Sequence, residues 1–115
     1  MNPVSKYHPL AHYKWGDNCD GWNLVDEAML SVKQERMPPG TAEQLHYHKE
    51  SGQFFFILSG AATIITDDKR VTLGTGQGFY IRPGCIHSIE NSTAKDVEFL
   101  LCSQPPTKTD RINCG

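Results

Sequence analysis

The stretch that decides the fold runs from Gly40 to Gly60 and reads GTAEQLHYHKESGQFFFILSG. In order after Gly40 come five residues, His46, one residue, His48, four residues, Gln53, and six residues before Gly60. Two histidines at positions i and i+2 of a β-strand point to the same face, with their Cα atoms about 7 Å apart. Two imidazoles placed in this way can converge on one metal ion.

A second punctuated stretch, residues 76–91, reads GQGFYIRPGCIHSIEN. An Arg-Pro-Gly turn at positions 82–84 is followed, after two residues, by His87. Fifteen residues separate this stretch from the first one. His87 therefore lies at a fixed number of residues from a turn, and His46 and His48 lie at fixed numbers of residues from the glycines on either side of them.

The spacing of the two stretches resembles the paired motifs of the cupin superfamily, and the resemblance covers Val32 to Cys102. Two positions depart from the family pattern: Gln53 stands where the first motif usually has glutamate, and Arg82 where the second usually has proline. The resemblance implies an all-β fold, the double-stranded β-helix or jelly-roll barrel of a small single-domain cupin. It leaves the reaction open, because this fold carries many chemistries.

The rest of the chain is also typical of an all-β protein. Short apolar or alternating runs are separated by turn residues about every eight to twelve positions, as in sandwiches and barrels. The expected strands are 22–24, 29–37, 44–48, 53–58, 62–66, 71–73, 79–82, 86–90 and 97–102. We divide the chain into an N-terminal arm and turn at residues 1–21, a barrel at 22–104 and a C-terminal tail at 105–115. Little regular structure is expected in the arm before residue 16, which contains two prolines.

Composition and charge narrow the class of protein. A net charge of −2 over 115 residues argues against a nucleic-acid-binding surface, which would need clustered lysine and arginine. The longest apolar run, Phe54–Leu58, is too short to cross a bilayer, and no signal-peptide pattern is seen. The four cysteines are scattered, which favours reduced thiols in the cytoplasm and leaves a Cys19–Cys114 bridge as the less favoured alternative.

We expect His46, His48 and His87 to bind one divalent transition metal ion (Zn, Fe, Ni, Mn or Cu), because neutral imidazole suits these metals. The motif adds Gln53 as a fourth ligand through its amide oxygen. Because glutamine is neutral, the centre would be one charge more positive than with glutamate and would favour an anionic substrate. Three alternatives stay open. Gln53 forms a hydrogen bond to a neighbouring group and does not bind the ion, or Glu50 is the fourth ligand although Ser51 and Gly52 indicate that the strand has already turned there. In the third, the histidines are buried and hydrogen-bonded without a metal.

Candidate substrate contacts come from the alternation of side chains along strands. Arg36 and Lys33 lie on opposite faces of one expected strand, so only one of them can face the barrel interior and bind an anion. Phe55 shares the face of Gln53, and Arg82 lies just before the turn that leads to the third histidine. Arg36, Phe55 and Arg82 are the candidates, with Lys33 as the alternative to Arg36. The other interpretations are a solvated or sheet-bridging charge for Arg36 or Lys33, and a place in an interface for Arg82.

The strand after Gln53 is apolar on both faces, so both faces should be covered. Phe54, Phe56 and Leu58 form the face that points away from the site. This face is expected to pack either under another sheet or against a second subunit. Small cupins commonly pair through their sheets, so the resemblance implies a homodimer.

Two functions are compatible with these residues. The first is a metal-dependent enzyme, of the isomerase or cyclase type or of the dioxygenase type, acting on a small polar substrate that is anionic or enolisable. The second is a non-catalytic module that binds or senses a small molecule. No Ser-His-Asp arrangement stands out and no acidic residue is marked as a general base, so the sequence assigns no catalytic residue. We favour the enzyme.

Overall fold

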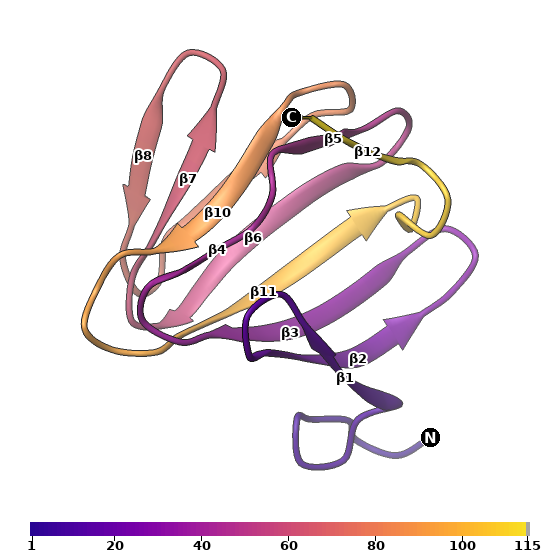
Figure 1. Cartoon of the computed structure of the whole chain (residues 1–115). Helices are drawn as coiled ribbons and strands as arrows, with labels where there is room; N and C mark the ends of the chain where they lie inside the picture. The colour runs from indigo at the N-terminus through magenta and orange to yellow at the C-terminus, as the bar shows by residue number, and fades with distance from the viewer. Residues whose placement is uncertain (115) are drawn as a thin grey trace.

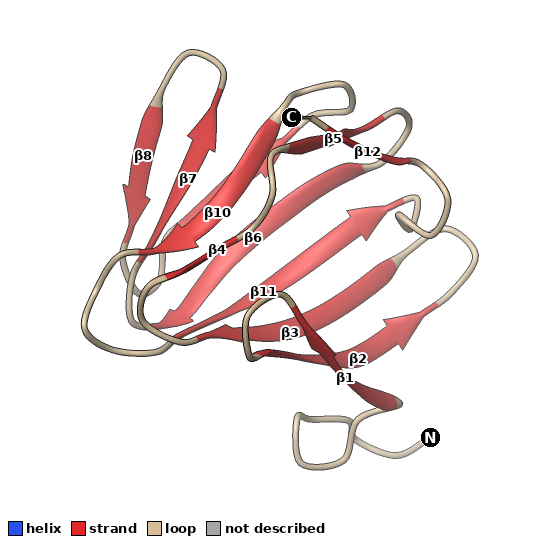
Figure 2. Ribbon diagram, viewed as in Figure 1, coloured by secondary structure: helices blue, strands red, loops and turns tan. Residues whose placement is uncertain are grey.

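The computed structural model describes residues 1–114, and the part of the chain that it describes contains strands, turns and loops but no helix (Figure 2). None of these residues therefore forms a helix that could cross a membrane. Within residues 1–114 the strands are β1 (Ala11–Trp15), β2 (Cys19–Asp26), β3 (Ser31–Met37), β4 (Thr41–Ala42), β5 (His46–His48), β6 (Gly52–Ser59), β7 (Ala62–Thr66), β8 (Arg70–Leu73), β9 (Gly78–Ile81), β10 (His87–Asn91), β11 (Val97–Gln104) and β12 (Arg111–Asn113).

The strands form two antiparallel sheets that face each other (Figure 1). One sheet has the order β1-β2-β3-β11-β6-β9, and the other has the order β12-β5-β10-β7-β8, with β4 paired to β10. Neighbours in each sheet are mostly distant in sequence, which is how the chain winds back and forth between the layers. The expected all-β jelly-roll architecture is confirmed.

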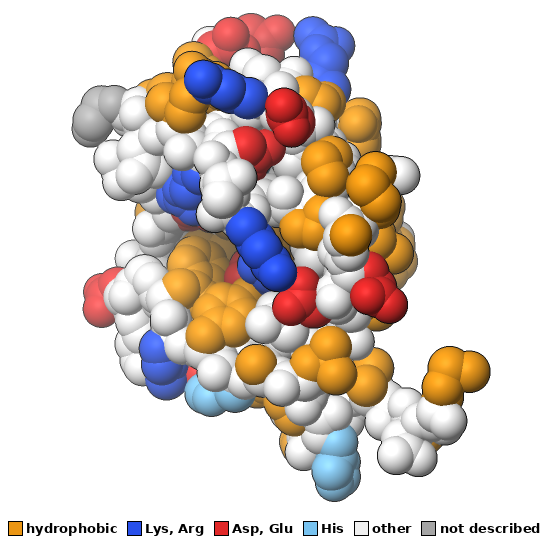
Figure 3. Space-filling view, turned by 90° about the vertical axis from the view of Figure 1, so that its right-hand side faces the viewer, with side chains coloured by type: hydrophobic (Ala, Val, Ile, Leu, Met, Phe, Trp, Pro, Cys, Tyr) orange, Lys and Arg blue, Asp and Glu red, His pale blue; other side chains and the backbone are white. Residues whose placement is uncertain are grey.

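The space between the sheets changes character from one end of the barrel to the other. Along β11 the inward side chains begin with Val97 and Phe99, both fully buried, and end with Ser103. Along β3 they run from Met37, also fully buried, back to Lys33. Each large apolar side chain buried at the first end stabilises the fold by about 1.5–3 kcal/mol. The second end of the space between the sheets is lined by polar side chains, so a binding site can form there. Figure 3 shows one face of the molecule, where hydrophobic side chains lie recessed between charged ones.

Two segments expected to be irregular are strands. β1 lies in the expected arm and pairs with β2 from Ala11–Asn23 to Trp15–Cys19. β12 lies in the expected tail and pairs with β5. Both were missed because each is held by a partner strand or by packing rather than by an apolar pattern of its own. The limits of the three segments remain a prediction, and Gly115 of the tail lies outside the described residues.

The four cysteines are free in the structure. Cys19 is buried in the core at the start of β2, and Cys114 follows β12 at the other side of the barrel. The alternative of a bridge between these two residues therefore finds no support in the fold.

Candidate metal centre

Three histidine side chains meet at the polar end of the barrel. His46 and His48 lie on β5, and His87 begins β10, where it pairs in register with His46. All three are buried, with 2%, 4% and 1% of their surface exposed. One ring nitrogen from each lies within 4.8 Å of the other two. The two sequence motifs therefore meet in space, and these residues could hold a metal ion.

The outer nitrogen of each imidazole is anchored by a hydrogen bond. The Nδ1 atoms of His46 and His87 each donate to the carbonyl oxygen two residues earlier, at 2.8 Å. Nδ1 of His48 donates to the Asp110 carboxylate at 2.9 Å. Because these oxygens accept, the proton of each neutral ring sits on Nδ1. Nε2 then keeps its lone pair, which is the tautomer that a metal ligand needs.

Burial keeps the three rings neutral. It lowers the pKa of His46 to about 3, and it also lowers the pKa of His48 and His87 below the ordinary value. The Asp110 carboxylate opposes this effect at His48 without reversing it. Since metals bind the unprotonated imidazole, the three ligands are ready at neutral pH without losing a proton first.

Gln53 lies beside His87 and is 4% exposed. Its Oε1 atom is 3.1 Å from Nε2 of His87, and its side-chain N–H donates to Oγ of Ser103 at 3.2 Å. In the tautomer set by Nδ1, both facing atoms carry lone pairs, and a cation next to them would satisfy both. Three nitrogens and one amide oxygen suit a divalent transition metal and leave positions for substrate. The residues present therefore fit such an ion, and Gln53 lies where its amide oxygen could be a fourth ligand.

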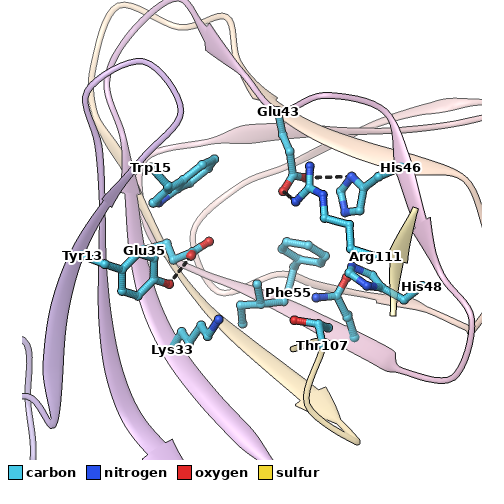
Figure 4. A pocket seen from close by; sticks show the side chains of 12 residues that line it. Tyr13, Trp15, Lys33, Glu35, Glu43, His46, His48, Phe55, Thr107 and Arg111 are labelled. Carbon is cyan, nitrogen blue, oxygen red and sulfur yellow. Dashed lines mark hydrogen bonds and ion pairs between the residues drawn. The ribbon is translucent and has the colours of Figure 1, made fainter. Parts of the chain in front are cut away.

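A cavity of about 190 Å³ lies in front of His46 and His48. Figure 4 shows that its walls come from both sheets, with His46 and His48 on one side and Tyr13, Lys33 and Glu35 on the other. The lining combines aromatic, basic and acidic side chains, namely Tyr13, Trp15, Lys33, Glu35, Glu43, His46, His48, Gln53, Phe55, Leu101, Thr107 and Arg111.

Glu35 is a buried acid in the wall that faces the histidines. Its side chain lies on the inner face of β3, and the residue is 9% exposed. The Tyr13 hydroxyl donates a hydrogen bond to Oε2 of Glu35. Burial raises the pKa of Glu35, although the Tyr13 hydrogen bond and the charge of Lys33 oppose the shift. Glu35 therefore holds a proton in conditions where an exposed glutamate has lost it.

The opposite wall contains a second acid, Glu43, next to Arg111. Oε2 of Glu43 lies 3.5 Å from the Arg111 guanidinium. Its other oxygen, Oε1, is buried and has no hydrogen-bond partner among the described residues. Burial raises the pKa of Glu43 to about 8, against the lowering effect of Arg111. The Arg111 charge is therefore only partly balanced by Glu43 at neutral pH.

A family model described as Cupin domain matches residues 33–103. The chain belongs to the cupin family. An uncharacterized protein of Methanocaldococcus jannaschii is 30% identical to this cupin over 84 residues, which are 73% of this chain and 67% of that one. The oxalate-binding protein of Thermotoga maritima is 34% identical over 65 residues, 56% of this chain and 54% of its own. The aligned part therefore spans about half of that relative.

A solved structure shows the same fold over the whole of this cupin. The polyketide cyclase RemF from Streptomyces resistomycificus superposes with a TM-score of 0.83, covering 100% of this chain and 86% of that one. The sequences are 15% identical, so this likeness shows the fold alone.

The three candidate substrate contacts of this cupin lie in different places. Phe55 lines the cavity, as expected from its alternation with Gln53. Arg36 does not: it lies on the other face of β3, where it pairs with Asp20 at 2.7 Å, so Lys33 is the basic residue of this strand that faces inward. Arg82 is exposed, follows β9 and lines a different surface pocket. The expectations for Arg36 and Arg82 are corrected accordingly.

Several cavity residues of this cupin could not be selected from the sequence. Tyr13 and Arg111 come from strands that had been expected as an irregular arm and tail. Glu35 was placed with Lys33 on one face of its strand, but nothing local showed that this face is the inner one. Glu43 lies inside the first motif, three residues before the first histidine, which was the only signal that pointed to it.

Proposed function

We propose that this cupin is a metal-dependent enzyme that acts on a small polar substrate with a negative charge or an enolisable carbonyl. One observation carries the proposal. The imidazoles of His46, His48 and His87 converge, and His46 and His48, with Gln53, line a cavity whose facing wall holds a buried acid, Glu35. Residues that could bind a Lewis-acidic metal ion and an acid that can transfer a proton, Glu35, therefore lie at the same cavity.

A divalent ion held by the histidines and Gln53 would polarise adjacent oxygen atoms of a chelating substrate. The residues of the chain supply orientation and proton transfer. Glu35 can give a proton to a bound substrate or take one from it, and Tyr13 fixes its carboxyl group by donating a hydrogen bond. This pairing favours a reaction that moves a proton, of the isomerase or cyclase type, over a dioxygenase reaction.

Charge in the cavity favours an anion. Lys33 and Arg111 carry positive charge into its lining, and burial favours the neutral form of Glu35. Gln53 contributes no charge, so a bound divalent ion would keep its full charge in surroundings that screen it weakly. A carboxylate or an enolate bound there would be stabilised by all three positive groups.

The size of the cavity favours a small molecule. A volume of about 190 Å³ corresponds to roughly six water molecules in the liquid. A short organic acid is of a size that suits this space. The relative named as an oxalate-binding protein supports the same class of ligand, because oxalate is a small dicarboxylate.

A non-catalytic binding module is the second candidate, and the name of that relative is the observation that favours it. Such a module would use the same ligands and the same basic residues. The two functions differ in whether Glu35 exchanges a proton with the bound molecule. We place either function in the cytoplasm, where free thiols such as those of this chain persist.

Metal analysis is the first test. Protein purified without a metal-affinity column should contain, or take up on titration, about one transition metal ion per chain, measured by inductively coupled plasma mass spectrometry. The variant His48→Ala should lose this ion, whereas His8→Ala, which changes an exposed histidine, should keep it. Protein that neither contains nor takes up a transition metal would contradict the proposal.

Proton exchange then separates enzyme from binding module. The metal-loaded protein is incubated in D₂O with a panel of 2-hydroxy acids, diketones and sugar acids, and deuterium incorporation is followed by NMR. Glu35→Gln should slow incorporation by at least about a hundredfold, and the exposed-acid control Glu50→Gln should not. Binding without exchange would indicate the module, and oxygen consumption with the same panel would indicate the dioxygenase.

A further inference from the structure

A second, smaller cavity adjoins the one in front of the histidines. Its volume is about 100 Å³, and it shares Lys33 and Thr107 with the first cavity. β3 passes along both. Its inner face presents Ser31 to the second cavity, Lys33 to both and Glu35 to the first. The two cavities therefore follow one another along a single strand face.

The register of the sheet relates the second cavity to the metal-binding wall. Ser31 pairs with Ser103 on β11, and Ser103 pairs with Gln53 on β6. Because neighbouring strands lie about 4.8 Å apart, Ser31 and Gln53 are separated by about 10 Å between their Cα atoms. A molecule only a few carbon atoms long, bound at the histidine wall, can therefore reach toward the second cavity.

The second cavity contains polar groups that lack partners in the protein. Oγ of Ser31 is buried and has no hydrogen-bond partner among the described residues, and the whole residue is 5% exposed. A buried hydroxyl in this condition is unfavourable unless a ligand or water bonds it.

Lys33 is the charged group of this cavity that is left unbalanced. It forms no salt bridge with the carboxylates of residues 1–114, and its Nζ lies 5.4 Å from the centre of the Tyr13 ring. The other cation in the lining, Lys108, is paired with Asp26 at 3.2 Å. Lys33 and Ser31, whose ammonium has no salt-bridge partner and whose hydroxyl has no hydrogen-bond partner within the described residues, thus both line the second cavity. The Lys33 ammonium lies toward the border of this cavity with the first (Figure 4).

We infer that the second cavity is a subsite for the far end of the substrate, and that this end is a carboxylate. The inference rests on the proposed function, because the near end must lie against the histidine wall. A single ammonium balances the single charge of a carboxylate, whereas a phosphate group brings up to about two charges. The substrate class is a short acid with two ends: a hydroxyl next to a carboxylate at the histidine wall, and a distal carboxylate at Lys33 and Ser31.

The test compares three acids with the same near end and different far ends. Isothermal titration calorimetry is performed on the metal-loaded full chain with 2-hydroxyglutarate, with 2-hydroxypentanoate, whose far end is a methyl group, and with 2-hydroxy-4-phosphonobutanoate. We expect 2-hydroxyglutarate to bind at least about tenfold more tightly than 2-hydroxypentanoate. A charge-assisted hydrogen bond between its distal carboxylate and Lys33 would account for a difference of this size.

Variants assign the difference to the subsite. Lys33→Met should weaken binding of 2-hydroxyglutarate at least about tenfold more than binding of 2-hydroxypentanoate, which also loses the charge that Lys33 brings to the first cavity. Ser31→Ala, which removes one oxygen atom and is the gentler change, should reduce the preference about threefold. The matched control Lys95→Met changes an exposed lysine outside both cavities and should leave the preference intact.

Each contrary result has a distinct meaning. Equal affinity for 2-hydroxyglutarate and 2-hydroxypentanoate, or a Lys33→Met variant that weakens both equally, would overturn the subsite alone. Tighter binding of the phosphonate would overturn its assignment to a carboxylate. A protein that takes up no metal, or that binds none of the three acids when loaded with metal, would overturn the proposed function and the subsite with it.

Discussion

The Asp110 carboxylate accepts a hydrogen bond from Nδ1 of His48 at 2.9 Å, although 62 positions separate the two residues in the chain. The same carboxylate accepts hydrogen bonds from the backbone N–H groups of Glu50 and Ser51, at 3.2 and 2.9 Å. The segment that leads into β12 thus holds both a candidate metal ligand and the turn that follows it. The C-terminal strand is therefore part of the site.

Removing this carboxylate should weaken metal binding. Asp110→Ala takes away the group that fixes the tautomer and orientation of His48, and such losses typically reduce metal affinity about 10- to 100-fold. Affinity is measured by competition with a fluorescent chelator, and thermal unfolding is followed in parallel by circular dichroism. The control is Asp67→Ala, an exposed acid in a hairpin turn. Unchanged affinity in a folded Asp110→Ala protein would show that His48 needs no such support.

Replacing Gln53 with glutamate should change the affinity for the metal ion and the affinity for anionic ligands in opposite directions. The added negative charge should raise metal affinity and lower the affinity of the loaded protein for oxalate by at least about tenfold, because charges interact strongly in this buried site. A neutral chelating diol serves as the comparison ligand and should be affected much less. Ser103 accepts the hydrogen bond from Gln53 in the structure and can turn its hydroxyl to donate to a carboxylate. Equal oxalate affinity in both proteins would place Gln53 outside the coordination shell.

Acid stability should depend on Asp20. Burial disfavours its charge, but hydrogen bonds from Lys14, His12 and Arg36 outweigh burial and hold the pKa of Asp20 well below its usual range. A carboxyl group whose pKa is lowered by folding contributes its stability above the unfolded pKa of about 3.9, and loses it as the pH falls through the folded value.

The variant Asp20→Asn tests this contribution. At pH 7 it should lower the free energy of unfolding by about 2 kcal/mol, a typical loss for hydrogen bonds to a charged group. The difference from the wild type should stay constant down to about pH 5 and then shrink below about pH 4. Urea denaturation at a series of pH values measures both quantities. A difference that is the same at pH 3 and pH 7 would contradict the assignment.

The outer face of β6 should form a contact between two copies of the chain. Phe54 and Leu58 are 40% and 37% exposed there, and Tyr80, which pairs with Phe54 across the sheet, is 61% exposed. An exposed apolar patch of this kind marks an interaction surface. Light scattering should therefore give about twice the chain mass of 12.9 kDa.

The variant Phe54→Lys should shift this mass toward the monomer, while Leu10→Lys, a change at an exposed apolar residue of the N-terminal segment, should not. A wild-type mass near 12.9 kDa at all concentrations would contradict the homodimer.

The fold and the candidate metal ligands were predictable because they depend on local features. Glycine and proline set the turns, and alternation along a strand sets which side chains share a face. His46, His48 and Gln53 follow from such spacing within one hairpin, and His87 follows from its distance to a turn.

The face of β3 that points into the cavity could not be predicted from neighbouring residues. Lys33 and Arg36 are equally basic, and their spacing is compatible with either one facing inward. Only the packing of this strand between β2 and β11 directs Lys33 to the cavity and Arg36 to the ion pair with Asp20.

The sequence by itself determined that three imidazoles would be presented from two hairpins of a β-barrel, because the periods of strands and turns are properties of neighbouring residues. Only the tertiary structure decided what surrounds them. Tyr13, Glu35, Arg111 and Asp110 reach the site from strands and loops far apart in the chain, since the pairing of distant strands depends on burial of the whole inner face rather than on any local pattern. The chemistry of the cavity is set by that pairing.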